Sequence, residues 1–188
     1  MEILPAHKSR PLEGGPSFSL KNRIFRAVWN TTWFMLAAWT PPPFHIWRNL
    51  ILRLFGADLQ PSSRVYGSTK VWYPPHLKMG SNSVIGPNAN CYCMDRIEIG
   101  NNSVISQGAH LCTGTHDIKS PHFQLQTRPI LIEDNVWIAT DSFIGPGVNV
   151  KAGVVVGACS ALFTDTVSYG VYRGNPAQLI KMRQFRNT

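Results

Sequence analysis

The chain has 188 residues, of which 44% are hydrophobic and 15% charged, so it is a folded protein with one packed domain and an appendage rather than a disordered tail. Its formal net charge is +8, and residues 1–53 hold seven Lys and Arg, two Asp and Glu, and four of the six Trp. A basic, Trp-rich beginning favours contact with an anionic membrane surface over nucleic-acid binding. A solvated basic face over a core-packing helix would give the same composition.

Residues 1–19 are rich in Pro and Gly and lack periodicity, which predicts a flexible leader, and residues 20–57 are predicted to be an N-terminal helical segment. The first helix should end at the prolines of residues 41–43. Its apolar run, residues 33–39, is too short to cross a bilayer. The second helix should present an apolar face at i, i+3, i+4, i+7 and i+8, formed by Trp47, Leu50, Ile51, Leu54 and Phe55. The helices cap the main domain, lie on a membrane, or do both.

The cysteines and the first apolar stretch both indicate a reducing compartment. No small-residue cleavage site follows that stretch, near residue 24, so we expect a cytoplasmic protein, with residues 20–55 as the segment that would touch the inner face of the membrane. Cys91, Cys93, Cys112 and Cys159 form no CxxC pair, and we expect reduced, mostly buried thiols.

A six-residue repeat dominates the rest of the chain. An aliphatic residue recurs without a slip at Ile132, Ile138, Ile144, Val150, Val156 and Leu162. Earlier blocks keep the same interval at Met79, Ile85 and Cys91, and again, after a two-residue slip that follows Ile97, at Ile99, Ile105 and Leu111. A weaker prelude runs through Val65, Val71 and Leu77.

This period fits neither an α-helix nor a hairpin sheet, but it fits a parallel β-helix of triangular cross-section with one hexapeptide on each side. We therefore predict an all-β fold in which residues 58–170 form the β-helix and residues 171–188 follow as a basic tail. The repeat stops after His116 and resumes at Ile132, which predicts a loop over residues 117–131.

Three histidines six residues apart, His110, His116 and His122, suggest a metal site. Residues six apart lie on adjacent sides of the triangle, however, so His110 and His116 should diverge, and His122 falls in the loop. We therefore expect no metal. Metal-dependent hydration, with ligands from neighbouring subunits, is a weaker alternative.

The repeat segment "IEDNVWIATDSFIGPGVNVKAGVVVGACSALFTD" and the later "GNPAQLI" resemble the hexapeptide-repeat acyltransferases, whose fold is a left-handed β-helix. "CTGTHD", "DNVWIA" and "GNPA" are similar to the sugar O-acetyltransferases of that class, and the leader "FSLKNRIFRAVWN" to a subgroup assigned to colanic acid and other exopolysaccharide synthesis. The resemblance covers residues 17–183. It implies a left-handed coil, acetyl-coenzyme A as acyl donor, and a homotrimer with active sites between subunits.

The resemblance makes His116 the catalytic base. A sugar hydroxyl that attacks a thioester must lose its proton as the new bond forms, and imidazole is suited to accept that proton near neutral pH. The developing oxyanion would need a backbone N–H at a coil corner, such as that of Ser142 or a neighbour. The other explanation of His116 is a turn histidine that only bonds the loop backbone.

The donor site is expected along coil corners and the tail. Small residues at Ala139, Gly157 and Ala158 would let the pantetheine arm approach the backbone, although corners demand small residues in any case. The resemblance makes Lys181 the closest match to a phosphate-contacting position, with Arg183 and Arg186 beside it, or else this basic run is a solvated end.

The acceptor site is expected on the preceding coil and at one tryptophan. Asn88, Asn90 and Asp95 are candidates, and Asn88 best matches an Asn of the related enzymes, whereas Asp95 stands one step out of register with their acidic residue. Trp137 matches a tryptophan beside the family's active site, or it packs at a subunit contact.

We therefore predict an acetyl-coenzyme-A-dependent O-acetyltransferase that acts on a sugar or lipid-linked oligosaccharide of a cell-surface polysaccharide. Two alternatives remain. One is an N-acetyltransferase acting on an amino-sugar nucleotide, and the other is a non-catalytic β-helix module that only assembles or binds partners.

Overall fold

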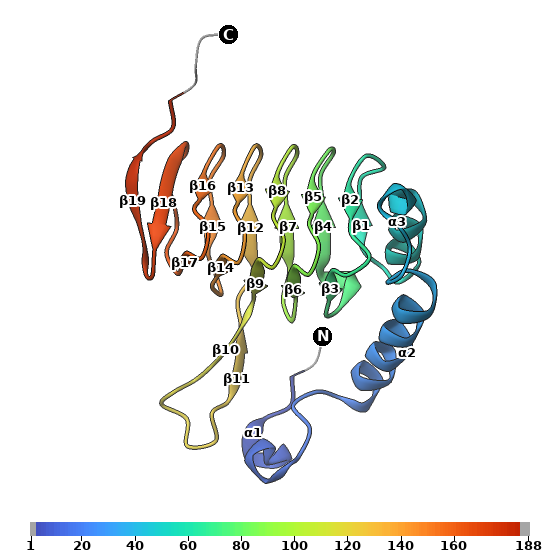
Figure 1. Ribbon diagram of the computed structural model, residues 1–188. Helices are drawn as coiled ribbons and strands as arrows, with labels where there is room; N and C mark the ends of the chain where they lie inside the picture. The colour runs from blue at the N-terminus through green and yellow to red at the C-terminus, as the bar shows by residue number, and fades with distance from the viewer. Residues whose placement is uncertain (1–2, 185–188) are drawn as a thin grey trace.

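The computed structural model describes residues 3–184, in which short parallel strands stack as the three sides of a β-helix (Figure 1). The first sheet contains β1 (Asp58–Leu59), β4 (Leu77–Met79), β7 (Ile97–Ile99), β12 (Ile130–Ile132) and β15 (Asn149–Val150). The second contains β2 (Arg64–Val65), β5 (Val84–Ile85), β8 (Val104–Ile105), β13 (Trp137–Ile138), β16 (Val155–Val156), β18 (Gly170–Gly174) and β19 (Ala177–Met182). The third contains β3 (Lys70–Val71), β6 (Asn90–Tyr92), β9 (His110–Cys112), β14 (Phe143–Ile144) and β17 (Ala161–Leu162).

The length of each coil explains the two-residue slip in the repeat. Ile85 pairs with Ile105, which makes that coil 20 residues long, whereas Ile138 pairs with Val156 in a coil of 18. The extra two residues belong to longer strands of the first sheet, where Ile97 and Ile99 both point inward and are buried. The slip therefore lengthens the first-sheet side of the coil and does not break the β-helix.

The repeating aliphatic residues form one continuous core. Within the second sheet Val65, Ile85, Ile105, Ile138 and Val156 stack with no exposed surface. Burial of each such side chain contributes about 1.5–3 kcal/mol relative to exposure.

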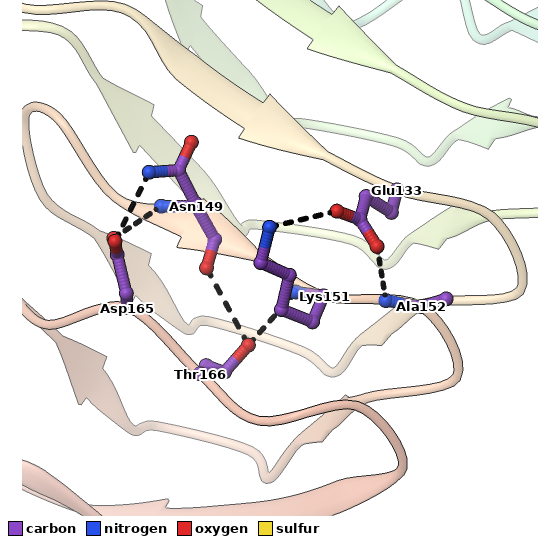
Figure 2. A network of polar contacts seen from close by, with 6 residues as sticks. All are labelled: Glu133, Asn149, Lys151, Ala152, Asp165 and Thr166. Atoms are coloured by element: carbon purple, nitrogen blue, oxygen red, sulfur yellow. Dashed lines mark hydrogen bonds and ion pairs between the residues drawn. The ribbon is translucent and has the colours of Figure 1, made fainter.

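Figure 2 shows a polar network in the last coils, around the ends of β12 and β15. The Lys151 ammonium lies 3.0 Å from one oxygen of Glu133, whose other oxygen accepts the Ala152 N–H at 2.9 Å. Asp165 accepts the backbone N–H of Asn149 at 2.8 Å and its side-chain amide at 3.1 Å. These bonds lower the pKa of Glu133, chiefly through Lys151, and that of Asp165, chiefly through the Asn149 N–H. Because the groups are exposed, the network orders the chain there more than it stabilises the fold.

Two helices at the N-terminal end pack on the first coils. In α2 (Leu20–Leu36) the buried Trp29 and Trp33 donate indole hydrogen bonds to the carbonyls of Val71, at 2.7 Å, and Gly67, at 3.1 Å. Short 3-10 turns, η2 (Pro42–Phe44) and η3 (Pro74–His76), lie before α3 and β4 respectively. No helix within residues 3–184 is long and apolar enough to span a bilayer.

The predicted apolar face of α3 (His45–Leu54) is only partly the buried one. Ile51 and Leu52 are buried together with Arg48, whereas Leu50 and Leu54 are 46% and 76% exposed. Arg48 turns inward because the backbone carbonyls before α3 need hydrogen-bond donors. Its guanidinium forms hydrogen bonds with Val65, Thr40, Pro41, Pro42 and His45. The helix therefore caps the β-helix and still exposes apolar side chains.

The predicted leader contains two short helical turns, α1 (Ala6–Ser9) and η1 (Pro11–Glu13), and reaches the predicted loop. The loop is an antiparallel hairpin of β10 (Gly114–His116) and β11 (Leu125–Thr127), and it projects from the β-helix on the side where α1 lies (Figure 1). The Gln124 side chain accepts the Ala6 N–H at 2.6 Å and donates to the Leu4 carbonyl at 3.4 Å.

Candidate active site

His116 ends β10, at the point where the hairpin leaves the corner between the third and first sheets. Its Nδ1 lies 2.7 Å from the carbonyl oxygen of Phe123, across the hairpin. Because a carbonyl oxygen only accepts, Nδ1 must carry the proton, and Nε2 of the neutral ring keeps a lone pair. The imidazole is exposed, so that lone pair is available to a ligand.

The loop backbone is arranged to hold this carbonyl. Phe123 has a φ of 46°, a left-handed conformation that is unfavourable by about 1–2 kcal/mol for a residue with a Cβ. Its N–H donates to the Ser120 carbonyl at 3.0 Å, and the Asp117 N–H donates to the Gln124 carbonyl at 2.8 Å. Strain of this kind persists only where surrounding contacts impose it, which marks the hairpin as a candidate functional element.

Of the predicted donor residues, Lys181 lies on the second sheet, in one row with Trp137, a predicted acceptor contact. Trp137 of β13 is followed in one row across the sheet by Val155 of β16, Val171 of β18 and Lys181 of β19. The Trp137 indole is half exposed and donates to the Ser106 hydroxyl at 3.0 Å. Trp137 and Lys181 therefore share an outer face although 43 residues separate them in sequence.

The small predicted residues lie beside this row, where β13 and β16 end at the corner between the second and third sheets. Ala139 and Gly157 occupy equivalent places in consecutive coils, where their N–H groups donate to the carbonyls of Val156 and Tyr172. Ala158, beside Gly157, is exposed. The Ser142 N–H, suggested as an oxyanion donor, is unsuited to that task because Ser142 is buried and this N–H points at the Ala139 carbonyl.

The two predicted cations of the tail diverge. Lys181 is exposed on β19, whereas the Arg183 guanidinium reaches the carbonyls of Asn135, at 3.4 Å, and Gly153, at 3.1 Å. Those carbonyls belong to the corner between the first and second sheets, away from Ala139. Arg186 lies outside the described residues.

Of the predicted acceptor residues, Asp95 lies beside the hairpin and Asn88 does not. The Asp95 N–H donates to the Thr113 hydroxyl at 2.9 Å, immediately before β10. Asn88 stands two coils before Ala139 at the corner between the second and third sheets, in a left-handed conformation with a φ of 57°.

Asn90 and Tyr92, on the outer face of the third sheet, lie closer to the hairpin than Asn88. The Asn90 amide approaches His110 Nε2 at 3.3 Å, and burial lowers the pKa of His110. The Tyr92 ring stands 6.2 Å from that of His110, and a Cβ added to Gly114 would lie 3.7 Å from Tyr92 Cε1. Sequence reasoning missed Tyr92, although it flanks the inward-facing Cys91 and must therefore point outward.

The histidines and cysteines do not converge. Within residues 3–184 no three His, Cys, Asp or Glu side chains gather as a metal site. All four thiols are free. Cys91 and Cys93 are buried, as expected, while Cys112 is partly buried and Cys159 is exposed. Burial raises the pKa of Cys93 to about 11 and raises that of Cys91 well above its ordinary value, so both stay protonated and unreactive.

No protein-family profile matches the chain. Solved structures of low sequence identity share its fold. A galactoside acetyltransferase in complex with coenzyme A is 21% identical, with 96% of this chain and 92% of that chain covered and a TM-score of 0.81. A hexapeptide-repeat acetyltransferase of Vibrio cholerae O1 biovar eltor, complexed with acetyl-coenzyme A, is 22% identical, with 91% and 93% covered and a TM-score of 0.79. The fold is thus the left-handed β-helix of the hexapeptide-repeat acyltransferases, as predicted.

A relative of higher identity narrows this class. The chain is 41% identical over 162 residues, 86% of this chain and 89% of the relative, to a protein of Escherichia coli (strain K12) named "Putative colanic acid biosynthesis acetyltransferase WcaF". The protein therefore belongs to the WcaF family of hexapeptide-repeat acetyltransferases. The predicted resemblance and the predicted enzyme class are both confirmed.

Proposed function

We propose that the protein transfers an acetyl group from acetyl-coenzyme A to a sugar hydroxyl during synthesis of a cell-surface polysaccharide, with His116 as the general base. The observation that carries this proposal is the bond from His116 Nδ1 to the Phe123 carbonyl, because it leaves Nε2 as the proton acceptor. The name of the WcaF relative supports the polysaccharide pathway.

The reaction is a direct attack. The acceptor oxygen bonds to the thioester carbonyl carbon while its proton moves to His116 Nε2. Collapse of the tetrahedral intermediate breaks the carbon–sulfur bond, and the imidazolium returns the proton to the departing thiolate. A positioned base of this kind contributes about 10²–10⁴-fold to the rate. An amine acceptor gains less from a base than a hydroxyl does, so the poised Nε2 favours O-transfer over N-transfer.

The donor site in this proposal follows the row on the second sheet. The pantetheine arm lies against the corner of Ala139, Gly157 and Ala158, where small side chains let it approach the backbone. Lys181 is the phosphate contact, with Arg183 as a second cation whose guanidinium must turn from its present carbonyl partners. Acetyl-coenzyme A and coenzyme A in the two structural neighbours support this choice of donor. No metal takes part.

The separation of the donor residues from His116 supports a homotrimer with active sites between subunits. His116 leaves the corner between the third and first sheets, whereas Ala139 and Gly157 lie at the corner between the second and third. Within one chain the donor corner and His116 therefore stand at opposite ends of the third-sheet strands, the donor corner where these strands begin and His116 beyond where they end. A neighbouring chain that presents its donor corner to His116 would complete the site. Asn88, Asp95 and Trp137 are the proposed acceptor contacts.

The helical segment is proposed as a peripheral membrane contact. Residues 20–55 expose apolar side chains and carry Lys21, Arg23, Arg26 and Arg53 with no acidic residue. Apolar insertion and attraction to anionic lipid would act together there.

The test is thiol release from acetyl-coenzyme A with a panel of sugars, lipid-linked oligosaccharides and amino-sugar nucleotides. We expect acceptor-dependent release that falls at least about a hundredfold in His116→Ala, since a base is worth that much. His122→Ala is the matched control, because its side chain is exposed on the same hairpin. Equal activity of His116→Ala and parent would contradict the assigned base. Transfer only to amino sugars would establish the N-acetyltransferase, and failure of the parent to bind coenzyme A would leave a non-catalytic module.

A further inference from the structure

A cavity of about 510 Å³ lies between α2 and the outer face of the third sheet, at the N-terminal end of the β-helix. Its lining combines aromatic rings with a few polar groups, as ligand pockets usually do. The rings are those of Trp29, Trp33, Phe34, Trp72 and Tyr92. Lys70 and Asn90 are among the polar side chains on the sheet side.

The cavity continues into a second depression of about 420 Å³, lined by the residues Phe34, Met35, Ala38 and Trp39, all with apolar side chains. Phe34 and Ala38 line both spaces, so the two are adjacent. Phe34 and Trp39 are 75% and 73% exposed, which is unusual for large apolar side chains close together on a surface. Together the two spaces form a track with polar groups in its first part and only apolar side chains in its second.

The polar part of the track adjoins the catalytic hairpin. Tyr92 and Asn90 line the cavity, and the Tyr92 ring approaches Gly114, two residues before His116. The Arg26 guanidinium lies over the Trp72 ring, 4.2 Å from its centroid, and brings a positive charge near the cavity. A ligand in the track would therefore have one end near β10 and the other at the exposed end of α2.

The charge of the helical segment suits an anionic lipid surface, with Lys21, Arg23 and Arg26 on the N-terminal half of α2 and the apolar part of the track at its C-terminal end. Residues 14–57 contain Lys21, Arg23, Arg26, Arg48 and Arg53 and no Asp or Glu. Four of these five are on α2 or are exposed on α3, since only Arg48 is buried. A water-soluble partner with an acidic face would match the charge but not the exposed Phe34, Met35 and Trp39.

We propose that this track binds a glycolipid acceptor, with the sugar between Asn90, Tyr92 and the hairpin and the hydrocarbon chain along Phe34, Ala38 and Trp39. The inference rests on the proposed sugar acetyl transfer and specifies its substrate class. It means that the enzyme acts on a sugar already attached to a lipid and takes it from the membrane surface at the end of α2.

The test measures binding without catalysis, with methyl, butyl, hexyl and octyl β-D-glucosides as probes, below their micelle concentrations. Titration calorimetry on the full-length protein should give affinities that rise about twofold to fourfold per added methylene, because each one leaves water. Phe34→Glu should weaken octyl glucoside binding at least about tenfold and leave methyl glucoside binding unchanged, since a carboxylate replaces the apolar wall.

Leu54→Glu is the matched control. Leu54 is 76% exposed, nearly the same as Phe34, and lies on α3 outside both spaces. It should bind every glucoside as the parent does. Affinity independent of chain length would overturn the proposal, and so would equal loss in the two variants, which would indicate general adsorption. Dissociation of the assembly by Phe34→Glu in sedimentation would assign the track to a second copy of the chain and also overturn it.

The outcome separates this inference from the proposed function. Binding of octyl glucoside is measured without acetyl-coenzyme A, so its dependence on chain length does not require acetyl transfer. Chain-dependent binding without any acetyl transfer would refute the proposed function alone. The glycolipid track alone would be refuted if binding did not depend on chain length and a free sugar were acetylated with the same kcat/KM as its alkyl glycoside.

Discussion

The contact between the leader and the catalytic hairpin should matter for turnover. Gln124 follows Phe123, whose carbonyl holds His116, and its side chain bonds Ala6 at 2.6 Å, Leu125 at 3.2 Å and Leu4 at 3.4 Å. Gln124→Ala removes all three bonds, worth together about 1.5–4.5 kcal/mol at ordinary values for neutral hydrogen bonds. The leader would then lose the hydrogen bonds that the Gln124 side chain makes to it, and the hairpin would lose the contacts with the leader that help to hold it in place.

This energy sets the size of the expected effect. If these bonds alone held the hairpin, the population with His116 correctly placed would fall about 10- to 2,000-fold. The β10–β11 pairing and the bond from His116 to Phe123 remain, so we expect kcat to fall about fivefold to twentyfold. The KM for acetyl-coenzyme A should change less than about twofold, since the donor row lies on the second sheet.

Steady-state kinetics with the best acceptor would check this, beside limited proteolysis of the leader. Gln124→Glu keeps the acceptor for the Ala6 N–H and should recover most of kcat, while Leu12→Ala, at an exposed leader position, should match the parent. A leader that becomes protease-sensitive in Gln124→Ala while kcat stays at the parental value would refute the reasoning, because the hairpin would then hold His116 unaided.

Three further changes have predictable effects. Arg48→Met should lower the free energy of unfolding by about 3 kcal/mol or more in urea titration, because several buried carbonyls lose their donor. Gly114→Ala should lower the Tm, since its Cβ would overlap Met94 Cε, and Met94→Ala in the same chain should restore part of the loss. On acidification, the Tm of Asp165→Asn should fall less than the Tm of the parent. The folded state lowers the pKa of Asp165, so its contribution is present above the ordinary carboxyl pKa and disappears as the pH falls through the lowered value.

The fold could be predicted because each repeat carries its own signal. An inward aliphatic such as Ile138 or Ile144 is required at every side of the triangle, and the two-residue change after Ile97 only lengthens one side. The excursion after His116 was equally visible as a break in the repeat, whereas its antiparallel pairing, which begins at Gly114, was not. The left hand was not visible in the period and came from the resemblance.

The features that were misjudged depend on contacts between residues far apart in the sequence, or on backbone carbonyls that need hydrogen-bond donors. The α3 pattern suggested an apolar buried face, but the carbonyls of the proline-rich turn drew Arg48 inward and left Leu54 outside. The leader reaches the hairpin through a single Gln side chain 118 residues away, which no local pattern reports. Asn90 and Tyr92 could have been found, because both neighbours of an inward-facing Cys91 must face outward.

The rigidity of the β-helix leads to a test of where the active site is assembled. Ladder hydrogen bonds lock every coil, so one chain cannot bring His116 to its own Gly157 corner by bending. If neighbours complete the site, His116→Ala and Ala158→Trp damage different halves of it, and chains carrying one change each should complement. Any mixed ring of three contains one neighbouring pair with an intact base and an intact donor corner in the required order. Mixed trimers purified through two different tags should therefore regain about one-third of the parental activity. Sites built within single chains would give none, and that result would refute assembly between neighbours while leaving the role of His116 intact.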